Sequence, residues 1–242
     1  MQEEPLFLSA QWQYLAMSNY EVPPEIVLPY VPKGTEPDFY NGKTYASLVG
    51  FWFAHTRVMG FSIPFHRNFE EVNLRLYVRR QDADGQWQRG VVFVKEIVPR
   101  MAIALTARWV YNEPYISLPM QHSILLKDSN LLVEYRWKFN KEWNFIKVRA
   151  EAAPHPLQAG TLEEFITEHY WGFNRQKNGN TMAYRVAHPQ WQIFGVHAHE
   201  VHCNVAQLYG KQFEPYLQTT PASVLLAQGS AIEVRKGRIV SG

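Results

Sequence analysis

The 242-residue sequence contains a single cysteine, Cys203, which excludes an internal disulfide framework. Its longest nearly apolar run, residues 48–54, is far too short to cross a bilayer as a helix. Lysine and arginine never occur more than two in a row and the net charge is only +2, so the electrostatic footprint of a nucleic-acid-binding protein is missing. The acidic N-terminus does not resemble a secretory signal. These absences predict a cytoplasmic protein that binds neither nucleic acids nor membranes.

The common catalytic motifs are also missing. The sequence has no G-x-S-x-G nucleophile elbow, no Walker loop, no G-x-G-x-x-G turn and no paired C-x-x-C. Their absence argues against the usual hydrolase, nucleotide-binding and zinc-module classes. No cofactor is predicted.

Aromatic side chains, in contrast, are abundant and make up 14% of the residues. Aromatic residues suit a pleated, half-buried surface and therefore favour β-sheet. With 46% hydrophobic and 19% charged residues, the composition is that of a globular protein. Sandwiches and barrels often reach this length as a single domain, so we expect one domain over residues 1–242, with a homo-oligomer left open.

Proline and glycine are scattered between short periodic segments, which is typical of many strands joined by turns. One short helix is expected near residues 23–29. A capping box formed by Thr161 and Glu164 predicts a second helix, whose buried stripe extends to His169. Because parallel crossovers usually need helices, this pattern predicts a mostly β fold, an antiparallel, barrel-like sheet around a cavity. The expected strands cover residues 6–20, 44–57, 71–80, 91–97, 101–111, 122–128, 131–139, 143–151, 181–187, 191–203 and 222–240.

A row of polar residues follows one face of the expected strand at residues 71–80. Glu71, Asn73 and Arg75 alternate with apolar residues and therefore share one face of the strand. Glu71 and Arg75 lie roughly 13 Å apart at about 3.3 Å per residue, so they cannot pair with each other. Either this face is solvated, as in many antiparallel sheets, or it lines the inside of a barrel that holds one small molecule.

Further charged residues lie near this row in the sequence. His66 belongs to the loop before it, Glu96 to the paired strand and Arg108 to the next extended run. An arginine fork suits a carboxylate or phosphate group on a ligand. Glu71 and Glu96 are the candidate catalytic bases if the protein is an enzyme. The candidate ligand-binding residues are His66, Glu71, Asn73, Arg75 and Arg108.

Histidines are concentrated in residues 197–203. In a strand, His197 and His199 point to the same side and would make a usable pair of metal ligands, whereas His202 points to the other side. The alternative is a solvent-facing strand with an inert thiol at Cys203, and we predict no metal site. The adjacent His202 and Cys203 face opposite ways, which makes them a poor base–nucleophile pair.

Several motifs occur in an order that points to one family. They include LSAQW at residues 8–12, NYEVPP at 19–24, LPYVP at 28–32, YASLVGF at 45–51, IPFH at 63–66, FEEVNLR at 69–75 and GVVF at 90–93. Over most of its length the chain resembles the YqjF-like family of uncharacterised proteins, which is grouped with the acetoacetate decarboxylase-like superfamily. The resemblance implies a closed, cone-like β-barrel around a central cavity, with a few short peripheral helices. It also implies that the polar row lines this cavity, with Glu96 and Arg108 on neighbouring strands.

The decarboxylases of that superfamily use a lysine that forms a Schiff base, with its pKa lowered by an adjacent lysine. The corresponding stretch here, residues 94–115, contains Lys95 but no Lys-Lys pair. Where the nucleophile is expected, residues 106–109 include Arg108, which stays protonated and cannot form an imine. The resemblance therefore implies the fold and the cavity without the Schiff-base chemistry.

Two classes of function follow. The first is a small-molecule-binding protein that holds an anionic organic molecule through Arg75 or Arg108. The second is an enzyme acting on a small organic acid, with a cavity glutamate as base and an arginine that stabilises the anion. A metal-dependent enzyme built on His197 and His199, and an interaction role for exposed aromatics such as Trp87, are further alternatives.

Overall fold

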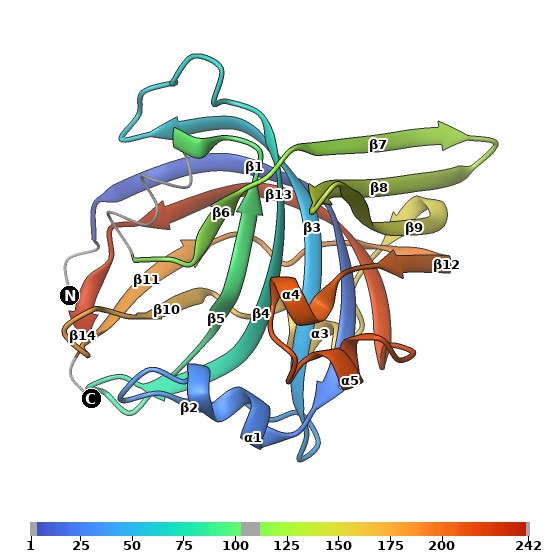
Figure 1. The fold of residues 1–242 in the computed structure, drawn as a ribbon. Coiled ribbons are helices and arrows are strands. Elements are labelled where there is room, and N and C mark those ends of the chain that lie inside the picture. The colour runs from blue at the N-terminus through green and yellow to red at the C-terminus, as the bar shows by residue number, and fades with distance from the viewer. Residues whose placement is uncertain (1–3, 103–111, 241–242) are drawn as a thin grey trace.

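The computed structural model describes residues 4–102 and 112–240, which form a 14-stranded sheet and several short helices (Figure 1). Strand content confirms the prediction of a mostly β fold. The strands are β1 (Leu6–Val22), β2 (Glu36–Pro37), β3 (Thr44–Val58), β4 (Phe69–Gln81), β5 (Trp87–Val98), β6 (Tyr115–Ser117), β7 (Met120–Lys127), β8 (Asn130–Phe139), β9 (Glu142–His155), β10 (Trp171–Arg175), β11 (Thr181–Ala187), β12 (Ile193–His202), β13 (Ser223–Arg235) and β14 (Arg238–Val240). The helices are α1 (Pro24–Val27), α3 (Leu162–Thr167), α4 (Val205–Leu208) and α5 (Glu214–Leu217), with a 3-10 turn, η1 (Leu28–Tyr30).

Seven of the strands pair in a ring, in the order β1, β3, β4, β5, β10, β11 and β13, because β11 also pairs with β13. The prediction of an entirely antiparallel sheet is wrong at two places, since β5 pairs in parallel with both β10 and β6. A parallel pair needs a long connection. The chain supplies one between β5 and β10, where β7, β8, β9 and α3 intervene. The hairpin of β7 and β8 extends away from the ring at the right of Figure 1.

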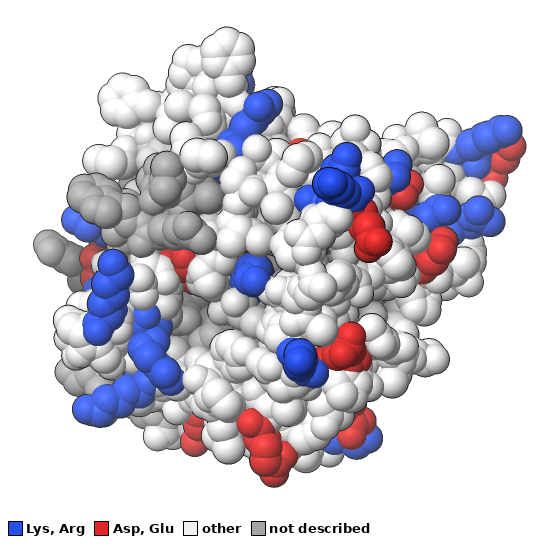
Figure 2. Space-filling model, in the orientation of Figure 1, with Lys and Arg blue, Asp and Glu red and all other residues white. Residues whose placement is uncertain are grey.

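One expected strand is wrong where the structure tests it. Met101 and Ala102, at the start of the expected strand at residues 101–111, are helical, and the rest of that segment, including Arg108, lies outside the described residues. The expected strand at residues 222–240 is split into β13 and β14. No helix within residues 4–102 and 112–240 is long and apolar enough to cross a membrane. On the face shown in Figure 2, basic side chains occur at several separate places with acidic ones among them.

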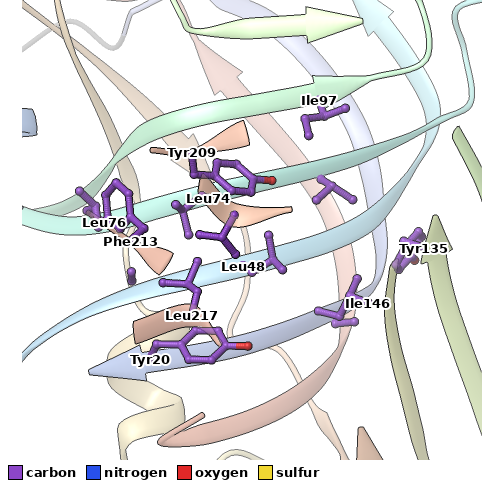
Figure 3. Close-up of a cluster of buried hydrophobic side chains, with 14 of the residues drawn as sticks. Tyr20, Leu48, Leu74, Leu76, Ile97, Tyr135, Ile146, Tyr209, Phe213 and Leu217 are labelled. Carbon is purple, nitrogen blue, oxygen red and sulfur yellow. The ribbon is translucent and has the colours of Figure 1, made fainter. Parts of the chain in front are cut away.

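Strand β4 is buried on both of its faces. Leu74 and Leu76 face outward from the ring and pack against Tyr209, Phe213 and Leu217, which belong to the segment of α4 and α5 (Figure 3). Each fully buried leucine contributes about 1.5–3 kcal/mol through removal of apolar surface from water. Because this segment covers the outer face, the polar residues on the other face of β4 must lie inside the ring.

The polar row is indeed inside. Glu71 and Asn73 are each 3% exposed and Arg75 is 9% exposed, so the solvated-face alternative is wrong. The surrounding interior is built from large apolar side chains of the ring strands and of α3, among them Met17, Phe51, Phe53, Phe69, Tyr77 and Phe165. A buried charge in such surroundings needs a partner or changes its protonation.

A β-bulge in β5 sets which residues face the interior. Asn73 lies opposite Glu96, but two residues further along β4 Arg75 lies opposite Phe93, so Val94 is the extra residue. In a regular strand Phe93 and Glu96 would point to opposite faces. The bulge reverses the alternation between them, and both side chains therefore face the inside of the ring.

Helix α3 begins at the predicted cap. The Thr161 hydroxyl accepts a hydrogen bond from the backbone N–H of Glu164, at 3.3 Å. The Glu164 carboxylate accepts from the N–H of Gly160, at 2.7 Å, one residue before the cap. The helix ends at Thr167, so His169 is not part of the helical stripe, although it is buried as expected.

Candidate functional site

A cavity of about 70 Å³ lies inside the ring of strands. Its apolar walls include Trp12, Phe51, Phe93, Trp171 and Trp191. This combination of aromatic walls and a few convergent polar groups is typical of small-molecule sites. The polar residues that line it are Glu71, Asn73, Arg75, Glu96, Thr167, His169, Tyr184 and His188.

The Arg75 guanidinium is held in place by neutral groups. Its Nε donates to the Tyr77 hydroxyl at 3.2 Å, and its Nη2 donates to the backbone carbonyl of Ile166 at 3.0 Å. The Tyr77 oxygen lies 2.5 Å from the Ser47 hydroxyl, which extends this network into β3. No carboxylate of the described residues forms an ion pair with Arg75. The cavity therefore contains a positioned, uncompensated positive charge.

His169 lines the same cavity and is neutral. Its Nε2 lies 3.1 Å from Oδ2 of Asp38, which also accepts from Nε of Arg89 at 2.7 Å. Burial lowers the pKa of His169 to about 4, and the hydrogen bond to Asp38 only partly offsets this. In the neutral ring, Nε2 carries the proton that is donated to Asp38, and Nδ1 is left as an acceptor. Within the described residues Nδ1 has no hydrogen-bond partner.

His188 is the second neutral imidazole of the cavity. Its ring stacks on Trp191, with centroids 4.2 Å apart. Burial lowers its pKa to about 4, and the positive charge of Arg75 acts in the same direction. Because both histidines are neutral at neutral pH, Arg75 is the positively charged group of the cavity.

Glu71 stands at the other end of the polar row. Its carboxyl accepts from Asn73 Nδ2 and from the Tyr115 hydroxyl, each at 3.0 Å. Burial nevertheless raises its pKa to about 7, because the two hydrogen bonds offset only part of the desolvation. A carboxyl group that titrates near neutral pH is suited to general acid–base chemistry.

Two further glutamates lie beside Glu71. Burial and the negative charges of Glu113 and Glu71 raise the pKa of Glu96 well above its ordinary value. Burial raises the pKa of Glu113 to about 8, although it accepts from the Tyr184 hydroxyl at 2.9 Å. The three carboxyl groups repel one another when ionised, so at neutral pH the cluster is largely protonated.

Several polar atoms around the cavity lack partners. Within the described residues, Asn73 Oδ1, Glu96 Oε2 and His169 Nδ1 are buried and make no hydrogen bond. Buried polar atoms are nearly always satisfied, so three such atoms around one cavity call for a ligand or ordered water.

The remaining sequence-predicted residues lie elsewhere. His66 lines a second cavity and its Nδ1 is 2.8 Å from the Pro64 carbonyl oxygen. Arg108 lies outside the described residues. His197 and His199 are exposed on β12, and no metal-binding group of three or more His, Cys, Asp or Glu occurs in the described part of the chain. Burial raises the pKa of the Cys203 thiol to about 12, which makes it a poor nucleophile.

Sequence reasoning missed six residues of the site: Glu113, Tyr115, Thr167, His169, Tyr184 and His188. The polar row predicted the β4 residues, but Glu113 and Tyr115 enter through the parallel pairing of β6 with β5, which leaves no local signal. Tyr184 had a local signal, because Met182, Tyr184 and Val186 occupy every second position of β11 and therefore share one face of the strand.

The overall arrangement is that of the acetoacetate decarboxylase-like fold. A crystal structure of acetoacetate decarboxylase from Legionella pneumophila subsp. pneumophila str. Philadelphia 1 is similar with a TM-score of 0.63 at 12% identity, covering 100% of this chain and 90% of that one. The enduracididine biosynthesis enzyme MppR complexed with pyruvate is similar with a TM-score of 0.65 at 14% identity, covering 100% and 92%. At these identities the similarity concerns the fold alone.

Within that class, the chain belongs to the DUF2071 family of uncharacterized conserved proteins, whose model matches residues 9–231. The uncharacterized protein YqjF of Bacillus subtilis (strain 168) is 27% identical over 171 residues, which are 69% of this chain and 67% of that protein. The resemblance found in the sequence motifs is thereby confirmed.

Proposed function

We propose that this protein binds a small organic carboxylate in the cavity inside its ring of strands. The main support for this proposal is that Arg75, whose buried guanidinium lines the cavity, forms no ion pair within the described residues. A buried charge is normally paired, and the planar guanidinium matches a carboxylate in a bidentate geometry. A ligand carboxylate would supply the missing partner.

The charge of the cavity supports this assignment. At neutral pH the buried histidines are uncharged and the glutamates carry raised pKa values, so Arg75 dominates the local field. The unpartnered Asn73 Oδ1 can accept from a hydroxyl group of a ligand, and a protonated Glu96 carboxyl can donate to a carbonyl group beside the ligand carboxylate. A 2-oxo acid has such a carbonyl beside its carboxylate. MppR, one of the proteins of similar fold, has been solved with pyruvate, a 2-oxo acid.

The proposed site differs from that of a Schiff-base enzyme. No lysine is among the described residues that line this cavity or the adjoining one. Lys95 donates instead to the Leu208 carbonyl on the outer side of the ring. We also propose that the ring of strands is closed and cone-like, with the cavity at its centre.

The test is isothermal titration with pyruvate at neutral pH. Arg75→Met removes the charge at similar side-chain length, and we expect pyruvate affinity to fall at least tenfold, because truncating one partner of a buried charge pair costs about 2–5 kcal/mol. Arg149→Met, an exposed position on β9, is the matched control. Unchanged pyruvate binding by a folded Arg75→Met variant would place the anion site elsewhere.

The raised pKa of Glu71 favours a second function at the same site, catalysis on the bound acid. Its carboxylate, deprotonated in part near pH 7, would take a proton from the carbon next to the ligand carbonyl, and Arg75 would stabilise the enolate-like anion. In deuterated water this step exchanges the methyl protons of pyruvate for deuterons, which proton NMR follows. Glu71→Gln should abolish protein-dependent exchange and leave the exposed control Glu200→Gln unaffected. If the wild-type protein catalyses no exchange, the catalytic function is ruled out and only the binding function stands.

A further inference from the structure

A second, larger cavity of about 210 Å³ adjoins the first. Its walls come from β1, β3, β4, β6, β11, β13, the connection between β3 and β4, and the residues Ala102 and Glu113, and they are mostly apolar. The apolar side chains include those of Leu8, Phe53, Val58, Phe69 and Val234. Nothing in the proposed binding of a short acid uses this space.

The two cavities share Glu71 and Tyr184 as wall residues. Around this shared wall, Glu71 accepts from Tyr115 and Glu113 accepts from Tyr184, so the polar groups are already arranged as a hydrogen-bonded set. The positive charge of Arg75 lies in the wall of the first cavity only. One molecule that occupied both spaces would therefore meet a cation at one end, hydrogen-bonding groups in the middle and apolar walls at the other end.

The position of Glu71 separates a short ligand from a long one. The backbones of Glu71 and Arg75 are roughly 13 Å apart along β4, but both side chains line the first cavity. Pyruvate bound at Arg75 would lie within the first cavity, beside Glu71, and would not enter the second. A carboxylic acid with an extended hydrocarbon chain would pass Glu71 and place its end against the stacked rings of Phe53 and Phe69, which line the second cavity.

We propose that the ligand is a carboxylic acid with an apolar tail, whose carboxylate binds Arg75 and whose tail fills the second cavity. This rests on the proposed function and names its substrate class. Ile63, which is 46% exposed, and His66 also line the second cavity, so the cavity reaches the surface at the connection between β3 and β4. A molecule can thus enter the second cavity from that side, and it would pass Glu71 and Tyr184, which line both cavities, to reach Arg75.

The experiment compares pyruvate, 2-oxohexanoate and 2-oxodecanoate by isothermal titration, with 2-decanone as a ligand that has the tail and the ketone but no carboxylate. Burial of a methylene strengthens binding about fourfold, so affinity should rise steeply from pyruvate to the longer acids. Arg75→Met should weaken all three acids and leave 2-decanone unaffected.

Val58→Trp tests the location of the tail, because a bulky side chain there fills the second cavity. It should reduce 2-oxodecanoate affinity toward that of pyruvate and leave pyruvate binding unchanged. Val224→Trp, at a half-buried position on β13 outside both cavities, is the matched control. Thermal unfolding checks that each variant is folded, and Leu8→Trp repeats the test from a different strand if Val58→Trp does not fold.

The outcomes separate the two proposals. Equal affinity for all three acids, lost in Arg75→Met, would overturn the tail assignment and leave the proposed function standing. Affinity that rises with chain length but survives both Val58→Trp and Leu8→Trp would also overturn it, because the tail would lie elsewhere. Binding of every acid that is independent of Arg75 would overturn the proposed function and, with it, this inference.

Discussion

Nε2 of His169 lies 3.1 Å from Oδ2 of Asp38, and both side chains are almost completely buried. Burial opposes ionisation of Asp38, but hydrogen bonds from His169 and Arg89 outweigh it and lower the pKa of the carboxyl. Arg89 supplies the compensating charge, so His169 can remain neutral. The pair fixes the imidazole with Nδ1 as an acceptor at the cavity wall, an orientation that a carboxylate commonly imposes on histidine.

This pair predicts a loss of stability in mild acid. The pKa of His169 is about 4 in the folded protein against an ordinary value of 6.5, so the unfolded chain binds the additional proton between these values. The stabilising effect of the neutral His169 is complete above pH 6.5. It falls, by on the order of 3 kcal/mol, as the pH approaches about 4. His169→Gln should flatten this part of the thermal-unfolding profile against pH. Exposed His199→Gln is the control, and equal profiles for both variants would contradict the assignment.

The interior row on β4 was predictable because its alternation is local. Glu71, Asn73 and Arg75 share one face in any regular strand, and only the burial of that face required tertiary information. Glu96 was placed on the correct neighbouring strand, but its inward orientation depends on the bulge at Val94, which the sequence does not mark. Bulges arise from the pairing of two strands, so they lie beyond single-strand reasoning.

We expect the buried glutamates to lower the stability of the folded protein as the pH rises, which is opposite to the effect of His169. The pKa of Glu113 is about 8 in the folded protein and 4.5 ordinarily, so the folded protein binds more protons between these values. Stability is therefore full in mild acid and declines as the pH rises toward the higher value. Glu113→Gln keeps an acceptor for Tyr184 and should make the protein more stable than wild type at about pH 9, by roughly a few kcal/mol. Thermal unfolding across pH measures this, with Glu200→Gln as the exposed control. A variant that loses stability with pH as steeply as wild type would contradict it.

We expect that replacing the two exposed histidines of β12 leaves the metal content of the protein unchanged. His197 and His199 are exposed, and the described part of the chain offers no third ligand near them. The double variant His197→Ala, His199→Ala should retain the zinc content of the wild-type protein after dialysis, measured by elemental analysis. A fall in bound zinc in the double variant would restore the metal-dependent alternative.

Other parts of the structure escaped prediction because they are short or depend on distant contacts. Helices α4 and α5 have four residues each, about one turn, which is too short for helical periodicity to appear in the sequence. They matter because Phe213 and Leu217 cover the outer face of the ring. His169 lies beyond the end of α3, and it reaches Asp38, a residue 131 positions earlier in the chain.

Gly172 in β10 leaves room for the Tyr184 ring, which lines both cavities. A Cβ at this position would overlap that ring, whose hydroxyl donates to Glu113. Gly172→Ala should therefore destabilise the protein by about 1–3 kcal/mol, the usual cost of overpacking, and weaken ligand binding by displacing the ring. Gly195→Ala is the control, because there the nearest atoms belong to the flexible Glu151 side chain at 3.3 Å. Combining Gly172→Ala with Tyr184→Ala should cost less than the sum of the single changes, since the second change removes the overlap. Additive losses in thermal and chemical unfolding would show that Tyr184 is not the residue Gly172 accommodates.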